Sequence, residues 1–370
     1  MGASRYFYAK KRGTKLNINE LGQLFITGFE SIALSEQEGE FLESNNIGGV
    51  ILFTRNYQDP AQLAELVNQI QTKRDEYPLF ISVDQEGGRV KRFKDSFIQL
   101  PSMLTLGKND SPKLTFELHQ AMAAELSACG INLDFSPTCD IWTNPKNTVI
   151  GDRAFGDNPE LVERHVSAAI RGLHAGNVIA CAKHFPGHGN TTKDSHYELP
   201  YVTAEMNQLE KIELKPFIKA AKSRVEFMMM AHLIVDAIDP DLPCALSKKA
   251  YDFCRERLKY KKIIVTDDME MHAITKHFSV EEAAIKALES GADILLYRSM
   301  EQSSIAFKAV KEAVRNGRLK LKMIEEKIER VKACKKSHFK GYEPIYIPSI
   351  AKALNSENQS KLLSKVNLEA

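Results

Sequence analysis

The chain has 370 residues, of which 43% are hydrophobic and 26% charged, a balance typical of a globular protein with a large core. Its 50 basic and 48 acidic residues leave a net charge of +2, which gives no sign of the basic surface that nucleic-acid binding requires. No stretch is apolar enough to span a bilayer or to serve as a signal peptide. We therefore expect no nucleic-acid partner and no membrane partner.

The cysteines give no sign of a disulfide framework. There are six of them, scattered without a Cys-x-x-Cys pair, in a chain large enough to fold without covalent links. We expect reduced thiols. Together with the lack of an export signal, this favours a cytoplasmic location.

Eight short apolar runs recur along the chain, and polar loops and helical patterns separate them. They cover residues 24–29, 48–53, 79–84, 131–136, 178–183, 227–235, 262–268 and 292–297. Alternating strands and helices predict right-handed crossovers and a parallel sheet, and eight units predict closure into a (β/α)₈ TIM barrel of the α/β class. An open doubly wound sheet is the alternative.

Two of the predicted helices have clear start signals. Asp59 precedes Pro60 at the start of one, and Asn158 precedes Pro159 at the start of the other, which Gly176 ends. Their apolar residues fall on one face, and these are Leu63, Leu66, Val67 and Ile70 in the first helix and Val162, Val166, Ala169 and Leu173 in the second. The Lys-rich segment 320–336 alternates bases with acids and predicts a solvent-exposed helix face.

We expect a single catalytic domain over residues 21–338, with a leader over 1–20 and a tail over 339–370. The tail is interpreted as a surface helix or a disordered end, and a dimerisation arm is the less favoured alternative. The protein is expected to be a monomer.

Catalytic residues of such barrels lie at the C-terminal ends of strands and in the loops that follow. Unusual polar residues occur at these places. They are Asp84 after the third run, Asp134 and Asp140 in and after the fourth, the segment KHFPGHGNTTKDSH (183–196) after the fifth, and Asp267 and Asp268 at the end of the seventh. No glycine-rich phosphate loop follows the seventh or eighth run.

Four segments in this order, VDQEGGRV, IGDRAF, KHFPGHG with DSH, and TDDMEM, resemble the β-N-acetylhexosaminidases of glycoside hydrolase family 3. The resemblance extends from about Gly22 to Cys334. It implies a single-barrel, exo-acting, retaining β-N-acetylglucosaminidase that removes terminal β-GlcNAc from muropeptide fragments in cell-wall recycling. No metal or other cofactor is implied.

Retaining hydrolysis of a glycoside needs a carboxylate nucleophile and a group that protonates the leaving oxygen. Asp267 and Asp268 both fit the first role by spacing, and the family pattern of Thr followed by Asp favours Asp267. His196 is the predicted acid/base, because an ordinary histidine pKa of about 6.5 suits proton transfer near neutrality. Asp194, two residues earlier, is placed to orient its ring.

The resemblance also implies a set of residues that hold the hydroxyls of the terminal sugar: Asp84, Arg92, Arg153, Lys183 and His184. Charged groups form the stronger hydrogen bonds with hydroxyls. Buried ion pairs that brace the barrel rim are the alternative explanation for these residues. His188 and His232 are interpreted as structural.

Three other functions stay open at this point. A β-glucosidase of the same family is the nearest. The second is a metal-dependent hydrolase, in which His184, His188, Asp194 and His196 would instead bind a metal ion. A sugar-binding barrel without catalysis is the third.

Overall fold

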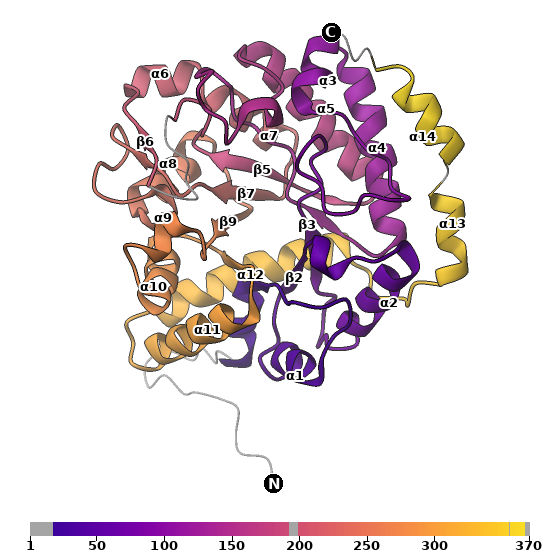
Figure 1. Ribbon diagram of the computed structural model, residues 1–370. Helices are drawn as coiled ribbons and strands as arrows, with labels where there is room; N and C mark the ends of the chain where they lie inside the picture. Colours follow the sequence, from indigo (N-terminus) through magenta and orange to yellow (C-terminus); the bar gives the residue numbers. More distant parts are fainter. Residues whose placement is uncertain (1–17, 192–198, 355, 367–370) are drawn as a thin grey trace.

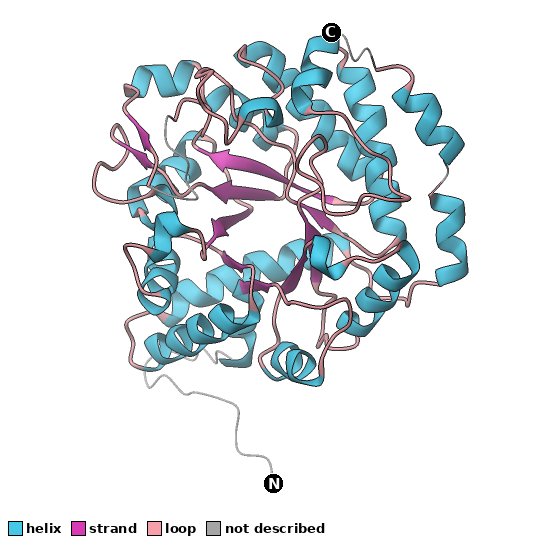
Figure 2. Ribbon diagram, viewed as in Figure 1, coloured by secondary structure: helices cyan, strands magenta, loops and turns pink. Residues whose placement is uncertain are grey.

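Eight parallel strands form the centre of the protein, and helices surround them in the computed structural model, which describes residues 18–191, 199–354 and 356–366 (Figures 1 and 2). The barrel strands are β1 (Phe25–Thr27), β2 (Gly49–Leu52), β3 (Phe80–Val83), β4 (Leu133–Asp134), β5 (Ile179–Phe185), β7 (Phe227–Met230), β9 (Ile263–Asp268) and β10 (Ile294–Tyr297). They close in the order β1-β10-β9-β7-β5-β4-β3-β2. The predicted (β/α)₈ barrel is confirmed, and the open sheet is wrong.

One predicted run divides into two strands. Ile234–Val235 form a separate strand, β8, which pairs with β6 (Tyr201–Val202) outside the barrel. The single strand predicted over residues 227–235 is therefore wrong. Both parts of the run are buried, so hydrophobicity alone gave no signal of the break. The chain leaves the barrel where Ile234 N–H donates to Pro200 O.

Helices connect the strands and cover the outside of the barrel. They are α1 (Glu36–Ser44), α2 (Pro60–Gln71), α3 (Met103–Asn109), α4 (Pro112–Ala128), α5 (Pro159–Ala175), α6 (Met206–Lys211), α7 (Leu214–Lys222), α8 (Lys248–Arg257), α9 (His272–Thr275), α10 (Val280–Ser290), α11 (Met300–Arg315), α12 (Leu321–His338), α13 (Ile350–Ala353) and α14 (Ser356–Leu363). Among the described residues, no helix has the length and apolar character needed to cross a membrane.

Two helices begin where the sequence predicts. The Asp59 carboxylate accepts hydrogen bonds from two backbone N–H groups in the first turn of α2, which begins at Pro60. Asn158 accepts one such bond at the start of α5, and Gly176 follows the last residue of that helix. The apolar faces predicted for both helices are buried.

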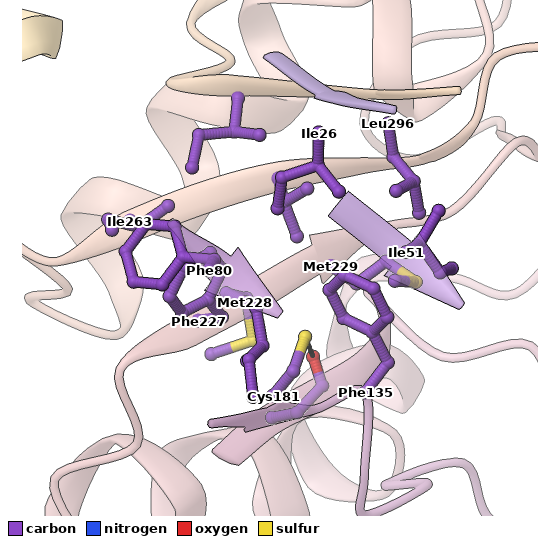
Figure 3. Packing of buried hydrophobic residues seen from close by; sticks show 14 of the residues in the cluster. Ile26, Ile51, Phe80, Phe135, Cys181, Phe227, Met228, Met229, Ile263 and Leu296 are labelled. Atoms are coloured by element: carbon purple, nitrogen blue, oxygen red, sulfur yellow. Dashed lines mark hydrogen bonds between the residues drawn. The ribbon is translucent and has the colours of Figure 1, made fainter. Parts of the chain in front are cut away.

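Apolar side chains from different strands fill the interior of the barrel (Figure 3). Phe80 from β3 and Phe227 from β7 meet edge to face, with ring centroids 5.2 Å apart. Ile26, Ile51 and Met229 are buried in the same hydrophobic cluster. Burial of each such side chain contributes about 1.5–3 kcal/mol, so the strand ends that carry the polar residues stand on a rigid frame.

Helix α12 closes the N-terminal end of the barrel, and the prediction of a solvent-exposed face is wrong for two of its lysines. Lys335 is fully buried and its ammonium donates to Gln23 Oε1 and to Gly48 O, both at 2.8 Å. Lys327 donates to Ala292 O at 2.7 Å. These acceptors all lie just before barrel strands. Burial lowers the pKa of Lys335 to about 7.

The segment after α12 lies along α2 and α4 (Figure 1). The Asn68 side chain forms hydrogen bonds of 2.8 and 3.2 Å with the backbone of Ile345. Gln359 in α14 donates to Glu125 Oε1 at 2.7 Å, and Ile350 in α13 is buried. The tail therefore contributes surface helices that pack on the barrel domain, and its boundary at residue 339 stays a prediction.

We expect Lys335→Met to make the stability of the fold less dependent on pH. In the wild type, the folded state releases the Lys335 proton near pH 7, whereas the unfolded chain keeps it up to about pH 10.4. The free energy of unfolding therefore rises with pH between these values, by at most about 1.4 kcal/mol per pH unit. The variant lacks this rise, and urea unfolding at pH 7 and pH 9 measures it.

Lys322→Met in the same helix is the matched control. The Lys322 side chain is 88% exposed, so this variant should keep the pH dependence of the wild type. Lys335→Met should also lose about 1–3 kcal/mol, because the buried Gln23 Oε1 loses the donor that it has among the described residues. An unchanged rise from pH 7 to pH 9 in Lys335→Met would contradict the assignment.

Candidate active site

A cavity of about 410 Å³ opens at the C-terminal ends of the barrel strands. Every predicted site residue in the described part of the chain lines it: Asp84, Arg92, Arg153, Lys183, His184 and Asp267. The predicted acid/base His196 and its partner Asp194 lie outside the described residues. The fold thus brings six predicted residues together, and their individual roles stay predictions.

A charged network forms one side of the cavity, and Lys183 lies at its centre. The Lys183 ammonium contacts Asp84 Oδ1 at 2.8 Å and Glu86 Oε1 at 2.6 Å. Arg153 donates to both oxygens of Glu86, at 2.7 and 2.9 Å, and Arg92 contacts Asp84 Oδ2 at 3.2 Å. Three cations and two anions therefore alternate, each held by an oppositely charged partner.

Both carboxylates of the charged network are ionised. Burial opposes their charge, but Lys183 and Arg92 outweigh it at Asp84, as Arg153 and Lys183 do at Glu86. The pKa of each carboxyl is therefore held below its ordinary value. Despite burial, the same ion pairs raise the pKa of Lys183 and of Arg153. Fixed donors and acceptors of this kind suit sugar hydroxyls, which both donate and accept.

Glu86 is a site residue that the sequence prediction missed. It follows Asp84 by two positions in VDQEGGRV, and alternate residues of an extended segment project to the same side. That spacing was a usable signal. The partner Arg153 lies 67 positions further along the chain, and only the fold reveals the contact.

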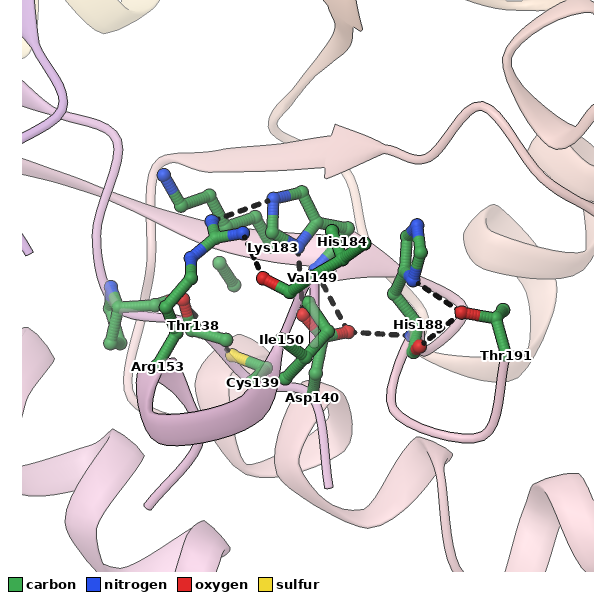
Figure 4. A network of polar contacts seen from close by, with 12 residues as sticks. Thr138, Cys139, Asp140, Val149, Ile150, Arg153, Lys183, His184, His188 and Thr191 are labelled. Atoms are coloured by element: carbon green, nitrogen blue, oxygen red, sulfur yellow. Dashed lines mark hydrogen bonds and ion pairs between the residues drawn. The ribbon is translucent and has the colours of Figure 1, made fainter. Parts of the chain in front are cut away.

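A buried carboxylate orients His184 (Figure 4). Asp140 Oδ2 lies 2.7 Å from His184 Nδ1, and Arg153 Nη2 lies 3.3 Å from His184 Nε2. Because arginine can only donate, Nε2 is the acceptor and the proton of the neutral ring is on Nδ1. Burial opposes ionisation of Asp140, but His184 outweighs it and the pKa of Asp140 is lowered. Asp140, a loop acid in the sequence, thus fixes the His184 tautomer.

The KHFPGHG segment packs closely against the loop after β4. A Cβ on Gly189 would lie 1.6 Å from the Ile141 carbonyl oxygen, so no side chain fits at this position. The His188 N–H donates to Asp140 Oδ1 at 2.7 Å, and its Nδ1 lies 2.9 Å from Thr191 Oγ1. These contacts support the interpretation of His188 as structural. They anchor the segment as far as Thr191 (Figure 4).

Asp267 has one carboxylate oxygen engaged and the other open. The Asp268 N–H donates to Asp267 Oδ1 at 2.8 Å, while Oδ2 accepts no hydrogen bond from the described residues. Burial opposes the charge, but His184 and His232 outweigh it and hold the pKa of Asp267 below its ordinary value. Asp267 therefore presents an ionised oxygen, Oδ2, to the cavity.

Asp268, the rival for the nucleophile, has both oxygens engaged. Its Oδ1 accepts from Glu270 N–H at 3.0 Å, and its Oδ2 lies 2.6 Å from Arg298 Nε. Burial raises the pKa of Asp268 to about 7 against the effect of Arg298. His232 Nε2 lies 2.9 Å from Asp268 O and supports this strand end. The geometry favours Asp267 over Asp268.

The described residues do not form a metal centre. In residues 18–191, 199–354 and 356–366, no three His, Cys, Asp or Glu side chains are placed to share an ion. His184 already has both ring nitrogens engaged by protein partners. The metal-dependent alternative also used Asp194 and His196, which lie outside this part of the chain. We derive no metal-dependent step.

The family follows from comparison with known proteins. Residues 16–334 match the family model described as "Glycosyl hydrolase family 3 N terminal domain". The chain belongs to this family. A curated β-hexosaminidase from Nitrosomonas eutropha is 39% identical over 269 residues, which cover 71% of this chain and 77% of the relative. The resemblance inferred from the motifs is confirmed, and the family 3 protein is a glycoside hydrolase of the β-hexosaminidase type.

Two solved structures have the same fold as this family 3 chain. A glycoside hydrolase family 3 β-N-acetylglucosaminidase from Paenibacillus sp. is 35% identical, with a TM-score of 0.86 over 93% of this chain and 68% of the relative. CbsA from Thermotoga neapolitana, solved with Zn bound, is 31% identical, with a TM-score of 0.81 over 90% of this chain and 71% of the relative.

We expect Glu86→Gln to weaken both the fold and catalysis. The variant keeps the size of the side chain but leaves Lys183 and Arg153 with one carboxylate fewer. Breaking a buried ion pair in this way costs about 3–5 kcal/mol. Urea unfolding measures the loss, and kcat/KM for a β-N-acetylglucosaminide should fall with it.

Glu43→Gln is the matched control, because the Glu43 side chain is 64% exposed and its ion pair with Lys73 lies on the surface. Its expected cost is about 0–1 kcal/mol. Equal stabilities of the two variants would show that Glu86 is not the partner on which the buried cations depend.

Proposed function

We propose that the protein is an exo-acting, retaining β-N-acetylglucosaminidase that removes terminal β-GlcNAc from muropeptide fragments. The observation that carries this proposal is the open Oδ2 of an ionised Asp267 in the same cavity as the charged network. A nucleophile and a set of hydroxyl partners are what a terminal sugar needs. The activity named for the Paenibacillus relative supports the choice of sugar.

The first half of the proposed reaction forms a glycosyl-aspartate. Asp267 Oδ2 attacks the anomeric carbon, the bond from this carbon to the glycosidic oxygen breaks, and the protonated His196 ring gives its proton to that oxygen. Asp194 stabilises the ring in its charged form. The products of this half are the covalent intermediate, the free aglycone alcohol and neutral His196.

The second half returns the enzyme to its starting state. Neutral His196 takes a proton from water, the water oxygen bonds to the anomeric carbon, and the carbon–oxygen bond to Asp267 breaks. The sugar leaves with its original β-configuration after two inversions. Because the pKa of Asp267 lies below its ordinary value, the nucleophile is ionised throughout the neutral range.

The cellular context belongs to the same proposal. Six free cysteines support a reducing compartment, so we propose a cytoplasmic location. There the enzyme would act on fragments recycled from the bacterial cell wall. That the enzyme is a monomer is a separate part of the proposal. The charged network provides the partners for the sugar hydroxyls, and no cofactor is required by this mechanism.

Replacing the nucleophile tests the mechanism directly. We expect Asp267→Ala to lower kcat for p-nitrophenyl β-N-acetylglucosaminide by at least about 10³-fold while the unfolding temperature stays near that of the wild type. Added azide should enter the vacated space, attack the anomeric carbon and give the α-glycosyl azide. Product release and the configuration of the azide adduct are measured together.

Asp268→Ala is the matched control, since it removes the neighbouring carboxylate. It should lose activity without recovery by azide, because the Asp267 nucleophile is still present. Recovery in Asp268→Ala but not in Asp267→Ala would reverse the assignment. Cleavage of the β-glucoside in preference to the acetamido sugar by the wild type would favour a β-glucosidase, and activity abolished by a chelator would favour the metal-dependent alternative.

Replacing the predicted acid/base should separate substrates by their leaving groups. We expect His196→Ala to reduce kcat far more for a poor leaving group, such as a disaccharide, than for 2,4-dinitrophenol, which departs without protonation. Rates for a series of aryl glycosides give the dependence on leaving-group pKa. Equal losses across the series would contradict this role for His196.

A further inference from the structure

Charged and apolar side chains line both sides of the cavity, and Val90, Val149 and Ile150 lie on the side of the charged network. The charged network belongs to β5 and to the loops after β3 and β4. On the side formed by β2, β9 and β10, four lining side chains are apolar: Ile51, Phe53, Met271 and Leu296. Only β1 separates β2 from β10 around the barrel, so these residues come from adjoining parts of the wall. Among the described residues, Asp267, Asp268 and Arg298 are the charged ones on this side.

Arg298 has hydrogen-bond donors to spare. Its Nε contacts Asp268 Oδ2 at 2.6 Å without hydrogen-bond geometry, and among the described residues no atom accepts a hydrogen bond from its Nη groups. On the other side of the cavity, Arg89 and Arg153 use Nη2 for carbonyl or carboxylate oxygens. The Arg298 side chain lines the cavity and is 43% exposed, so its guanidinium is available to a ligand.

The backbone of Arg298 lies close to the Phe53 ring. Arg55 Nη2 donates to Arg298 O at 2.7 Å. A Cβ on Gly28 would lie 2.3 Å from Arg298 O and 3.2 Å from the Phe53 ring, so the glycine lets both neighbours approach. A guanidinium, a carboxylate and an apolar surface therefore adjoin one another next to Asp267.

We propose that Arg298, with the apolar residues beside it, binds the 2-acetamido group of the substrate and determines the preference for GlcNAc over glucose. An acetamido group has a carbonyl acceptor, an N–H donor and a methyl group. The Nη groups of Arg298 supply donors for the carbonyl, Asp268 supplies an acceptor for the N–H, and the apolar side chains cover the methyl group. This inference rests on the proposed hydrolysis of β-GlcNAc.

The position of Arg298 and Asp268 agrees with the geometry of the sugar. The acetamido group is attached to C2, which is bonded to the anomeric carbon that Asp267 attacks. Its binding site must therefore adjoin the nucleophile, and Asp268 is the next residue along the strand. The hydroxymethyl group at C5 also flanks the anomeric carbon, through the ring oxygen. GlcNAc and glucose both carry the hydroxymethyl group, but only GlcNAc carries the acetamido group. Comparing the two sugars therefore shows which of these groups lies beside Arg298.

The test compares p-nitrophenyl β-N-acetylglucosaminide with the β-glucoside in Arg298→Met, which keeps the aliphatic stem, and in Arg298→Lys, which keeps a charge beside Asp268. We expect kcat/KM for the acetamido substrate to fall about 10- to 100-fold in Arg298→Met, the effect of a lost charged hydrogen bond. The value for the glucoside should fall much less, since it reflects only the loss of the Arg298–Asp268 contact, which both substrates share. Arg298→Lys, which lacks the planar fork, should show a smaller fall in the same direction.

Arg315→Met is the matched control, because Arg315 pairs with Glu312 on the surface, and both substrates should be cleaved as by the wild type. Equal losses on both substrates in Arg298→Met would overturn the inference in favour of a group common to both sugars, and an unchanged preference would overturn it outright. Calorimetric binding of free GlcNAc and glucose gives the same comparison without turnover. If the wild type does not cleave the β-GlcNAc substrate, the proposed function is contradicted. If Arg298→Met leaves the affinity for GlcNAc unchanged, only this inference is contradicted.

Discussion

The catalytic end of the barrel depends on one buried ammonium group. Lys183 projects from β5 between two carboxylates that follow β3, and one of these carboxylates also binds Arg153 from the loop after β4. Taking such charges out of water costs several kcal/mol per ion. The arrangement is stable because each charge has a partner of opposite sign, with contacts from 2.6 to 3.2 Å. The same contacts fix donors and acceptors in directions that a sugar can use.

A second buried lysine shows why the partners matter. Lys335 is as deeply buried as Lys183, but it lies at the opposite end of the barrel and its acceptors are the neutral oxygens of Gln23 and Gly48. The pKa of Lys183 is raised and that of Lys335 is lowered. The difference arises because carboxylates offset the loss of hydration and neutral oxygens do so only in part. One end of the barrel thus holds paired charges, and at the other end a buried lysine joins α12 to the segments before β1 and β2.

Asp267, the nucleophile that we propose, is oriented by its own strand end. The Asp268 N–H occupies one oxygen of Asp267, and the contact between Arg298 and the Asp268 carboxylate keeps that neighbouring acid engaged. Neither contact requires movement when substrate arrives, so the open oxygen is oriented in advance. Strand β9 and its neighbour β10 therefore combine the reacting group with the residues that we infer to select the sugar.

The sequence by itself determined the barrel and much of the cavity, because local signals were strong. Apolar runs separated by capped helices specify eight βα units, and strand ends are where such folds place function. Spacing alone could not choose between the two acids of TDD, and only the family pattern favoured Asp267. The structure separates them by a hydrogen bond and an ion pair. Only the tertiary structure decided which distant residues meet: Glu86 with Arg153, Asp140 with His184, and Lys335 with Gly48. These contacts join separate loops and helices. A local sequence pattern cannot predict them, because the two residues of each contact lie far apart along the chain.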